Sequence, residues 1–205
     1  INNQLSSILN YAVRFYELRS NPCHKAGSMG KSKADERPYW TLEEFQKFSD
    51  AIMDKRDSWM AFQILFWTGM RIGELLALQV NDVDFEHGTI RVDESLARID
   101  GEDLITAPKT ESSVRVITIH KELQDELREY IDTLYRPRLG TRLFAGRTKS
   151  FFEHEMERGI KLSGVKKITV HCTRHSHASM LVQMGFSPIE IAKRLGHGKV
   201  TTTIE

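Results

Sequence analysis

The sequence contains little cysteine and no long apolar run. Two of its 205 residues, Cys23 and Cys172, are cysteines, which is too few for a disulfide framework. No apolar stretch approaches the roughly 20 residues that cross a bilayer, and the longest, residues 61–67, fits a buried helix. The first residues lack the charged, apolar and small-residue zones of a signal peptide. These absences predict a soluble protein in a reducing, intracellular compartment, without a membrane partner.

The sequence also has almost no net charge, because 29 Lys and Arg residues offset 28 Asp and Glu residues. The charges are nevertheless distributed unevenly along the chain. Residues 81–103 contain eight acids and two arginines, whereas residues 158–199 contain eight bases and one acid, Glu190. Such segregation favours a polyanionic partner for the basic segment. On composition alone, an ordinary solvated face explains it equally well.

Apolar spacing predicts a mainly helical fold with a small three-stranded antiparallel sheet. Thr41 and Glu44 have the spacing of a capping box and predict a helix start. The segments with helical periodicity are residues 2–19, 42–54, 57–67, 71–79, 120–136, 149–161, 173–184 and 188–195. The β-rich segments, separated by turn residues, are 89–95, 104–108 and 114–119.

This pattern predicts three parts of the chain. The helix within residues 1–20 has little to pack against, so we expect it to be the last helix of a domain that lies upstream. Residues 21–37 are rich in polar residues, glycine and proline and are predicted to be an interdomain linker. Residues 38–205 are predicted to form the main domain.

Several polar side chains occupy positions suited to binding an anion or moving a proton. Arg71 follows a glycine stop and opens a helix, where backbone N–H groups already attract anions. Lys109 lies in a predicted hairpin turn, from which an amine can donate a proton. His171 and Arg174 flank a predicted helix start, and His197 follows a glycine after an apolar helix. Each of these features alone is also typical of an ordinary surface residue.

The segment "HCTRHSHASM" at residues 171–180 raises a metal site as an alternative. His175 and His177 are two residues apart and therefore do not share a helix face. His171 and His175 have the spacing of helical metal ligands only if the helix begins earlier than predicted. Cys172 has no second cysteine nearby and no feature that activates its thiol. We therefore predict neither a metal nor a thiol nucleophile.

Four stretches in order resemble the tyrosine recombinase (phage integrase) family. They are "TGMRIGELLAL" at 68–78, "PKT" at 108–110, "HCTRHSHAS" at 171–179 and "LGHGKVTTTIE" at 195–205. The resemblance covers residues 38–205 and has the character of mobile-element integrases of Gram-positive bacteria. It implies the fold of a tyrosine recombinase catalytic domain. It also implies that residues 1–20 are the final helix of a core DNA-binding domain.

The resemblance implies a role for each candidate residue. Arg71 and Arg174 would bind the non-bridging oxygens of the scissile phosphate. His171 and His197 would complete this cradle, and His171 would also take the proton of the nucleophile. Lys109 would protonate the 5′-oxygen leaving group.

Further residues are assigned supporting roles. Glu74, one turn after Arg71, is expected to support the histidine of the cradle. The basic residues expected to bind DNA are Lys166, Lys167, Arg158 and Lys199. The nucleophilic tyrosine of the family follows the last histidine by about nine or ten residues, just past Glu205. The chain is therefore expected to lack the C-terminal tail and to be inactive alone.

The implied function is site-specific recombination, in which DNA strands are cleaved and rejoined through a 3′-phosphotyrosyl intermediate to integrate or excise a phage or conjugative element. No cofactor is expected. The expected partners are double-stranded DNA attachment sites, a homotetramer in the synaptic complex, and an excisionase or DNA-bending host factors. The expected location is the bacterial cytoplasm, in association with the nucleoid. The alternatives are a catalytically inactive DNA-binding fragment of the same fold and a metal-dependent hydrolase built on the histidines.

Overall fold

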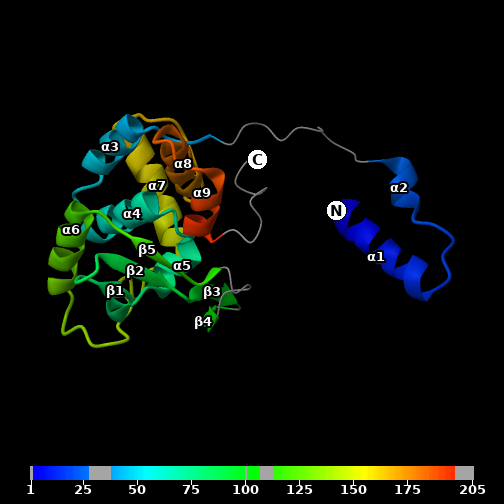
Figure 1. Cartoon of the computed structure of the whole chain (residues 1–205), viewed down its shortest axis with the longest axis horizontal. Helices are drawn as coiled ribbons and strands as arrows, with labels where there is room; N and C mark the ends of the chain where they lie inside the picture. The colour runs from blue at the N-terminus through cyan, green and yellow to red at the C-terminus, as the bar shows by residue number, and fades with distance from the viewer. Residues whose placement is uncertain (1, 28–37, 100, 107–112, 197–205) are drawn as a thin grey trace. The chain divides into compact units, whose positions relative to one another are not determined.

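The computed structural model of the chain describes residues 2–27, 38–99, 101–106 and 113–196. Residue contacts divide the chain into two compact units, Ile1–Arg37 and Pro38–Glu205 (Figure 1). Within the described ranges, no helix is both long enough and apolar enough to span a membrane.

The first unit contains α1 (Asn2–Phe15) and α2 (Pro22–Ala26). α2 lies inside the predicted linker, where no helix was expected, although Asn21 and Pro22 are a favourable pair for starting a helix. The Asn21 side chain accepts a hydrogen bond from the Cys23 N–H at 2.9 Å. It also donates to Asn10 Oδ1 at 2.8 Å, which ties α2 to α1.

The second unit is mainly helical, as predicted. Its helices among the described residues are α3 (Leu42–Ala51), α4 (Arg56–Thr68), α5 (Ile72–Ala77), α6 (Lys121–Asp132), α7 (Lys149–Ser163), α8 (Cys172–Gln183) and α9 (Pro188–Leu195). The capping box before α3 is confirmed: Thr41 Oγ1 accepts from the Glu44 N–H at 3.3 Å, and Glu44 Oε2 accepts from the Thr41 N–H at 2.9 Å. A short 3₁₀ helix (Val80–Asp82) follows α5.

The antiparallel sheet has three strands, and two of them lie where strands were predicted, at residues 89–95 and 114–119. Its order is β1 (Val83–Asp84), β2 (Thr89–Val92) and β5 (Arg115–Thr118). The remaining strands, β3 (Ser95–Ile99) and β4 (Glu102–Thr106), pair with each other in a separate hairpin. The predicted strand at 104–108 was therefore placed in the wrong sheet. β1 has only two residues, which is too short for an alternating pattern to reveal.

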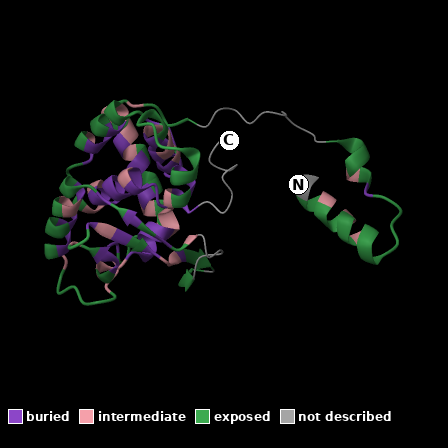
Figure 2. Cartoon of the chain, viewed as in Figure 1, coloured by how far each residue is buried: buried purple, intermediate pink, exposed green. Residues whose placement is uncertain are grey.

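The core of the second unit surrounds α4, which is buried on almost every side (Figure 2). A helix that is apolar all round is expected to be central, so the prediction for residues 61–67 is confirmed. Phe66 of α4 stacks on Phe45 of α3 with ring centroids 3.8 Å apart. Gly159 brings α7 close to α3, because a Cβ at this position would lie 2.3 Å from the Phe48 ring.

This packing brings the C-terminal end of α4 next to α8 and α9. Gly69, which ends α4, has a φ of +65°, a conformation that favours glycine. A Cβ at Gly69 would lie 2.6 Å from both the His177 and the Leu195 side chains. β5 packs against α9 on the same side of the unit. The ends of several elements, far apart in sequence, therefore meet at one place.

Candidate active site

Arg71 lies at this meeting point, as the residue immediately before α5. Its side chain is 39% exposed, and its Nη1 donates to Glu74 Oε1 at 2.8 Å. The Arg71 backbone N–H donates to Glu74 Oε2 at 2.8 Å. One carboxylate therefore holds both the backbone and the side chain of this arginine, while the guanidinium remains accessible to solvent.

Arg174 reaches the same region from α8 and is almost completely buried. Its Nη1 donates to the Gly69 carbonyl at 2.8 Å, and its Nη2 donates to the Leu195 carbonyl at 2.5 Å. A guanidinium has five N–H groups, so these two bonds leave donors for a further acceptor. Arg174 thus joins the ends of α4 and α9 and has N–H groups that these two bonds do not use.

The electrostatics of the region favour an anion. Burial and the positive charges of Arg71 and Arg115, opposed by the charge of Glu74, together lower the pKa of Arg174 to about 9. Arg174 therefore stays protonated at neutral pH but lies in an environment that is unfavourable for its charge. An added negative group would relieve this cost, which is the expected property of an anion-binding site.

Glu74 is bonded to two arginines. Its hydrogen bonds in the described structure go to Arg71 and Arg115. The predicted support of a histidine stays a prediction. The side chain is 6% exposed, and the hydrogen bonds from Arg115 and Arg71 outweigh burial, so the pKa of Glu74 is lowered. A buried carboxylate needs such partners, and the two arginines supply them.

Arg115 of β5 is the residue that the sequence analysis missed. Its Nη2 and Nη1 donate to the two Glu74 oxygens at 2.8 and 3.2 Å, and its Nε donates to the Arg194 carbonyl at 2.9 Å. A signal was present in the strand, because Arg115 has the same phase as the buried residues Ile117 and Ile119. A charged residue in the buried phase of a strand requires a buried partner of opposite charge.

His177 packs beside this group. It is 1% exposed, and its Nε2 accepts a hydrogen bond from Arg194 Nε at 3.0 Å. Arg194 also donates to the carbonyls of Trp67 and Thr118, both at 3.1 Å. His177 and Arg194 therefore fix α9 against α4 and β5.

The buried His177 is expected to make stability depend on pH. Burial, with the charge of Arg194, lowers its pKa from 6.5 to about 3. Between these two pH values the unfolded chain binds more protons than the folded chain, so stability should rise with pH up to about 6.5. His177→Asn keeps an acceptor for Arg194 and should narrow the difference in urea midpoint between pH 5 and pH 7.5. An unchanged difference would contradict the buried, neutral state of this histidine.

His171 lies next to Arg174 at the start of α8, and its side chain is exposed. α8 begins at Cys172, one residue earlier than predicted, so His171 and His175 are near one another, with ring centroids 5.2 Å apart. In the part of the chain that the structure describes, no three residues are grouped as metal ligands. Lys109, His197 and Lys199 lie outside the described residues. Gly196, which precedes His197, ends α9 in the left-handed conformation.

The residues predicted to bind DNA differ in their surroundings. Lys166 and Lys167 are exposed in the loop before α8, and Lys166 Nζ lies 5.4 Å from the centroid of the Tyr39 ring. Lys166 Nζ also lies 3.7 Å from Glu44 Oε2. Arg158 forms closer ion pairs, with Glu155 at 2.9 Å and Asp54 at 3.0 Å. The role of these residues in DNA binding stays a prediction.

Comparison with known proteins adds a family and a fold. A family profile described as "Phage integrase family" matches residues 40–205. The ICEBs1 integrase of Bacillus subtilis (strain 168) is 34% identical over 220 residues, covering 100% of this chain and 59% of the relative. The integrase of Staphylococcus phage L54a is 29% identical over 238 residues, covering 98% of this chain and 66% of the relative. This chain therefore spans about two thirds or less of the length of these relatives.

Solved structures show the same similarity. The Tn1549 transposon integrase (residues 82–397) in complex with circular intermediate DNA has a TM-score of 0.84 at 26% identity, covering 99% of this chain and 73% of that chain. A lambda integrase dimer bound to a core site has a TM-score of 0.68 at 19% identity, covering 98% and 71%, and supports the fold alone.

Proposed function

Because this chain belongs to the phage integrase family, we propose that it is the catalytic domain of a site-specific tyrosine recombinase. In this proposal the protein cleaves and rejoins DNA strands through a 3′-phosphotyrosyl intermediate and thereby integrates or excises a phage or conjugative element. The observation that carries the proposal is that Arg71 and the buried Arg174 belong to one positively charged region. The charge of Arg71 acts on Arg174 and lowers its pKa.

This arrangement suits phosphoryl transfer. Negative charge accumulates on the equatorial oxygens of the phosphorus as the tyrosine attacks, and fixed N–H donors aimed at these oxygens lower the barrier. Two guanidiniums bind such oxygens by charge-assisted hydrogen bonds. Because Arg174 is held by two backbone carbonyls and Arg71 by Glu74, these donors need little reorganisation when the phosphate arrives.

The remaining catalytic roles are also part of the proposal. His171 and His197 complete the phosphate cradle, His171 takes the proton of the nucleophile, and Lys109 protonates the 5′-oxygen. The location of His171 next to Arg174 at the start of α8 supports the first of these roles. We assign the nucleophile to none of the tyrosines at positions 11, 16, 39, 130 and 135, because none of them follows His197.

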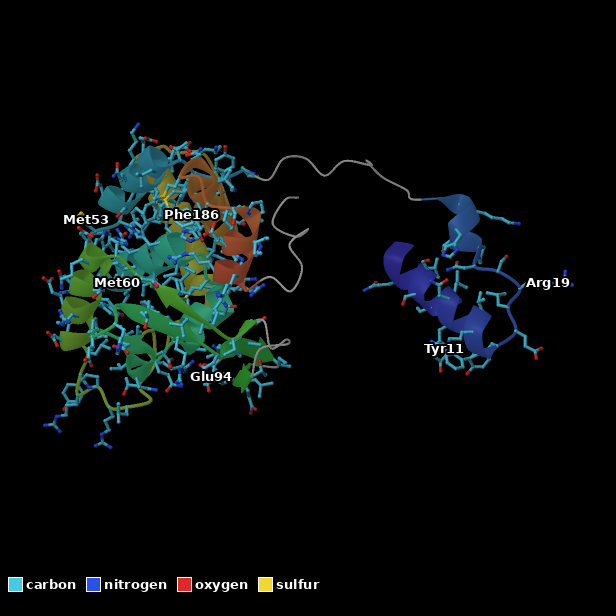
Figure 3. The ribbon with its side chains drawn as sticks, in the orientation of Figure 1. Tyr11, Arg19, Met53, Met60, Glu94 and Phe186 are labelled. Atoms are coloured by element: carbon cyan, nitrogen blue, oxygen red, sulfur yellow. The ribbon has the colours of Figure 1, made fainter. Side chains whose placement is uncertain are left out.

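We propose double-stranded DNA attachment sites as the substrate, since the Tn1549 integrase was solved with DNA. A homotetramer in the synaptic complex and an excisionase or DNA-bending factor are proposed as further partners. We also propose that α1 is the final helix of a core DNA-binding domain. In the first unit Tyr11 and Phe15 of α1 are each 57% exposed and Tyr16, the residue after α1, is 74% exposed, an aromatic surface that a larger domain would cover (Figure 3 labels Tyr11).

A suicide DNA substrate tests this function. The substrate carries a nick next to the cleavage site, so that a short fragment diffuses away and the covalent protein–DNA adduct accumulates. The full-length protein should form a denaturation-resistant adduct, and Arg147→Lys, a change at an arginine that pairs with Asp57 at the far end of α4, should not alter it. Tight DNA binding without any adduct would instead favour the inactive DNA-binding alternative.

The basic loop before α8 should contribute to DNA affinity without sequence preference. Lys166→Glu combined with Lys167→Glu should weaken binding to specific and random duplexes by a similar factor, because phosphate contacts carry no sequence information. The slope of log affinity against log salt concentration should also become shallower, by about one to two units for two lost contacts. Fluorescence anisotropy at several salt concentrations measures both effects. An unchanged slope would exclude this loop from the phosphate-binding surface.

A further inference from the structure

Arg115 contacts three parts of the candidate site with one guanidinium. Its Nη groups donate to both oxygens of Glu74, the carboxylate that holds Arg71. Its Nε donates to the Arg194 carbonyl, and its Nη1 also donates to the Ser113 carbonyl at 3.1 Å. These partners are Glu74 in α5, Arg194 near the end of α9, and Ser113, the first described residue after positions 107–112.

These partners adjoin the residues to which we assign catalysis. Glu74 positions Arg71 directly. The carbonyl of Leu195, the residue after Arg194, accepts a hydrogen bond from Arg174. Arg115 and Arg174, both buried, therefore donate to successive carbonyls at the C-terminal end of α9. Cations are favourable at this end of a helix, where unpaired carbonyls accumulate.

We propose that Arg115 is a positioning residue for strand cleavage, which holds Arg71 through Glu74 and fixes the end of α9 that precedes His197. The proposal deepens the proposed function and rests on it. We do not assign Arg115 to the phosphate, because it is buried and four of its five N–H groups donate to Glu74 and to two backbone carbonyls.

The chemistry of the guanidinium explains why an arginine is needed here. Its planar fork binds both oxygens of a carboxylate while Nε points to a separate acceptor. A lysine presents its donors from one nitrogen atom and would keep the charge opposite Glu74, but it would not hold Glu74 and the Arg194 carbonyl in the same geometry. Arg115→Lys therefore keeps the positive charge that neutralises the buried Glu74 and removes only the geometry that would position Arg71 and the end of α9.

The first test compares cleavage with binding in the full-length protein. Arg115→Lys should lower the rate of adduct formation on the suicide substrate by about tenfold to a hundredfold, because small displacements of catalytic groups have effects of this size. DNA affinity should change less than about twofold. Arg147→Lys is the matched control, because it shortens another arginine that holds a carboxylate, Asp57, through two nitrogens but lies away from the site.

The second test uses the dependence of cleavage on pH. Burial raises the pKa of Glu74 and Arg115 opposes this, so Arg115→Met should raise the pKa of Glu74 and let it release Arg71 at a higher pH. The acid limb of the cleavage profile should then move to higher pH, whereas Arg147→Lys should leave it in place. The charged groups facing Glu74 are Arg71 just before α5, Arg115 from β5, Arg174 from α8, and, around the adjoining cavity, Asp82, Arg91, Asp93 and Glu94.

The outcomes separate this inference from the proposed function. If the wild-type protein forms no adduct, the proposed function fails, and the inference fails with it. If the wild type forms the adduct and Arg115→Lys reacts at the same rate with the same acid limb, only the inference is overturned. A loss of rate that is matched by an equal loss of DNA affinity, or by the same loss in Arg147→Lys, would also overturn it.

Discussion

Arg174→Ala is expected to lower the rate of covalent adduct formation by at least about a hundredfold, the usual consequence of removing one donor to a transition-state oxyanion. In our account Arg174 supplies part of the positive charge that meets the phosphate. The same change leaves the carbonyls of Gly69 and Leu195 without their donor. We therefore also expect a loss of about 2 kcal/mol in the free energy of unfolding.

Arg174→Lys distinguishes the two effects. It keeps a positive charge but can donate with good geometry to at most one of the two carbonyls. The free energy of unfolding should therefore recover in part, while the rate of cleavage stays strongly reduced. Adduct formation on the suicide substrate gives the rate, and urea unfolding of the domain gives the stability. Cleavage by Arg174→Ala at close to the wild-type rate would remove this residue from the catalytic set.

Glu74→Ala should produce the largest loss of stability among these variants. Glu74 and Arg115 are 6% and 5% exposed, so the change leaves a buried guanidinium without its counter-charge. Breaking such a pair from one side typically costs about 3–5 kcal/mol. Thermal and urea unfolding of the domain measure the loss, and an effect below about 1 kcal/mol would contradict the buried ion pair.

The double variant Glu74→Leu with Arg115→Met is the control for that prediction. It removes both charges together and should be less destabilised than Glu74→Ala, because no uncompensated charge remains buried.

The pH dependence of the free energy of unfolding should also report this ion pair. The pKa of Glu74 is lowered on folding, so its contribution is present above its unfolded value near 4.5 and is lost as the pH falls through the lower folded value. The double variant should lack this contribution.

The sequence was most informative where local patterns decide the structure. The capping box at Thr41, the buried helix at residues 61–67 and the glycine stop at Gly69 depend on neighbouring residues, and all three were read correctly. The family resemblance also identified Arg71 and Arg174 as candidates, and the structure places them in one electrostatic environment.

The failures concern pairings between distant residues. Strand composition at residues 104–108 did not reveal its partner, and β4 pairs with β3 rather than with the three-stranded sheet. Arg115 was overlooked because its partners, Glu74 and the Arg194 carbonyl, lie 41 and 79 residues away. Such contacts depend on tertiary packing, which sequence periodicity does not report.

The most direct test of the account is the position of the scissile phosphate in a crystal structure of this protein bound to its DNA site. We predict that non-bridging oxygens of one phosphate lie within about 3.2 Å of guanidinium nitrogens of both Arg71 and Arg174. Glu74 and Arg115 should remain paired behind them. A complex in which the cleaved phosphate lies away from these two arginines, or contacts neither of them, would contradict the account.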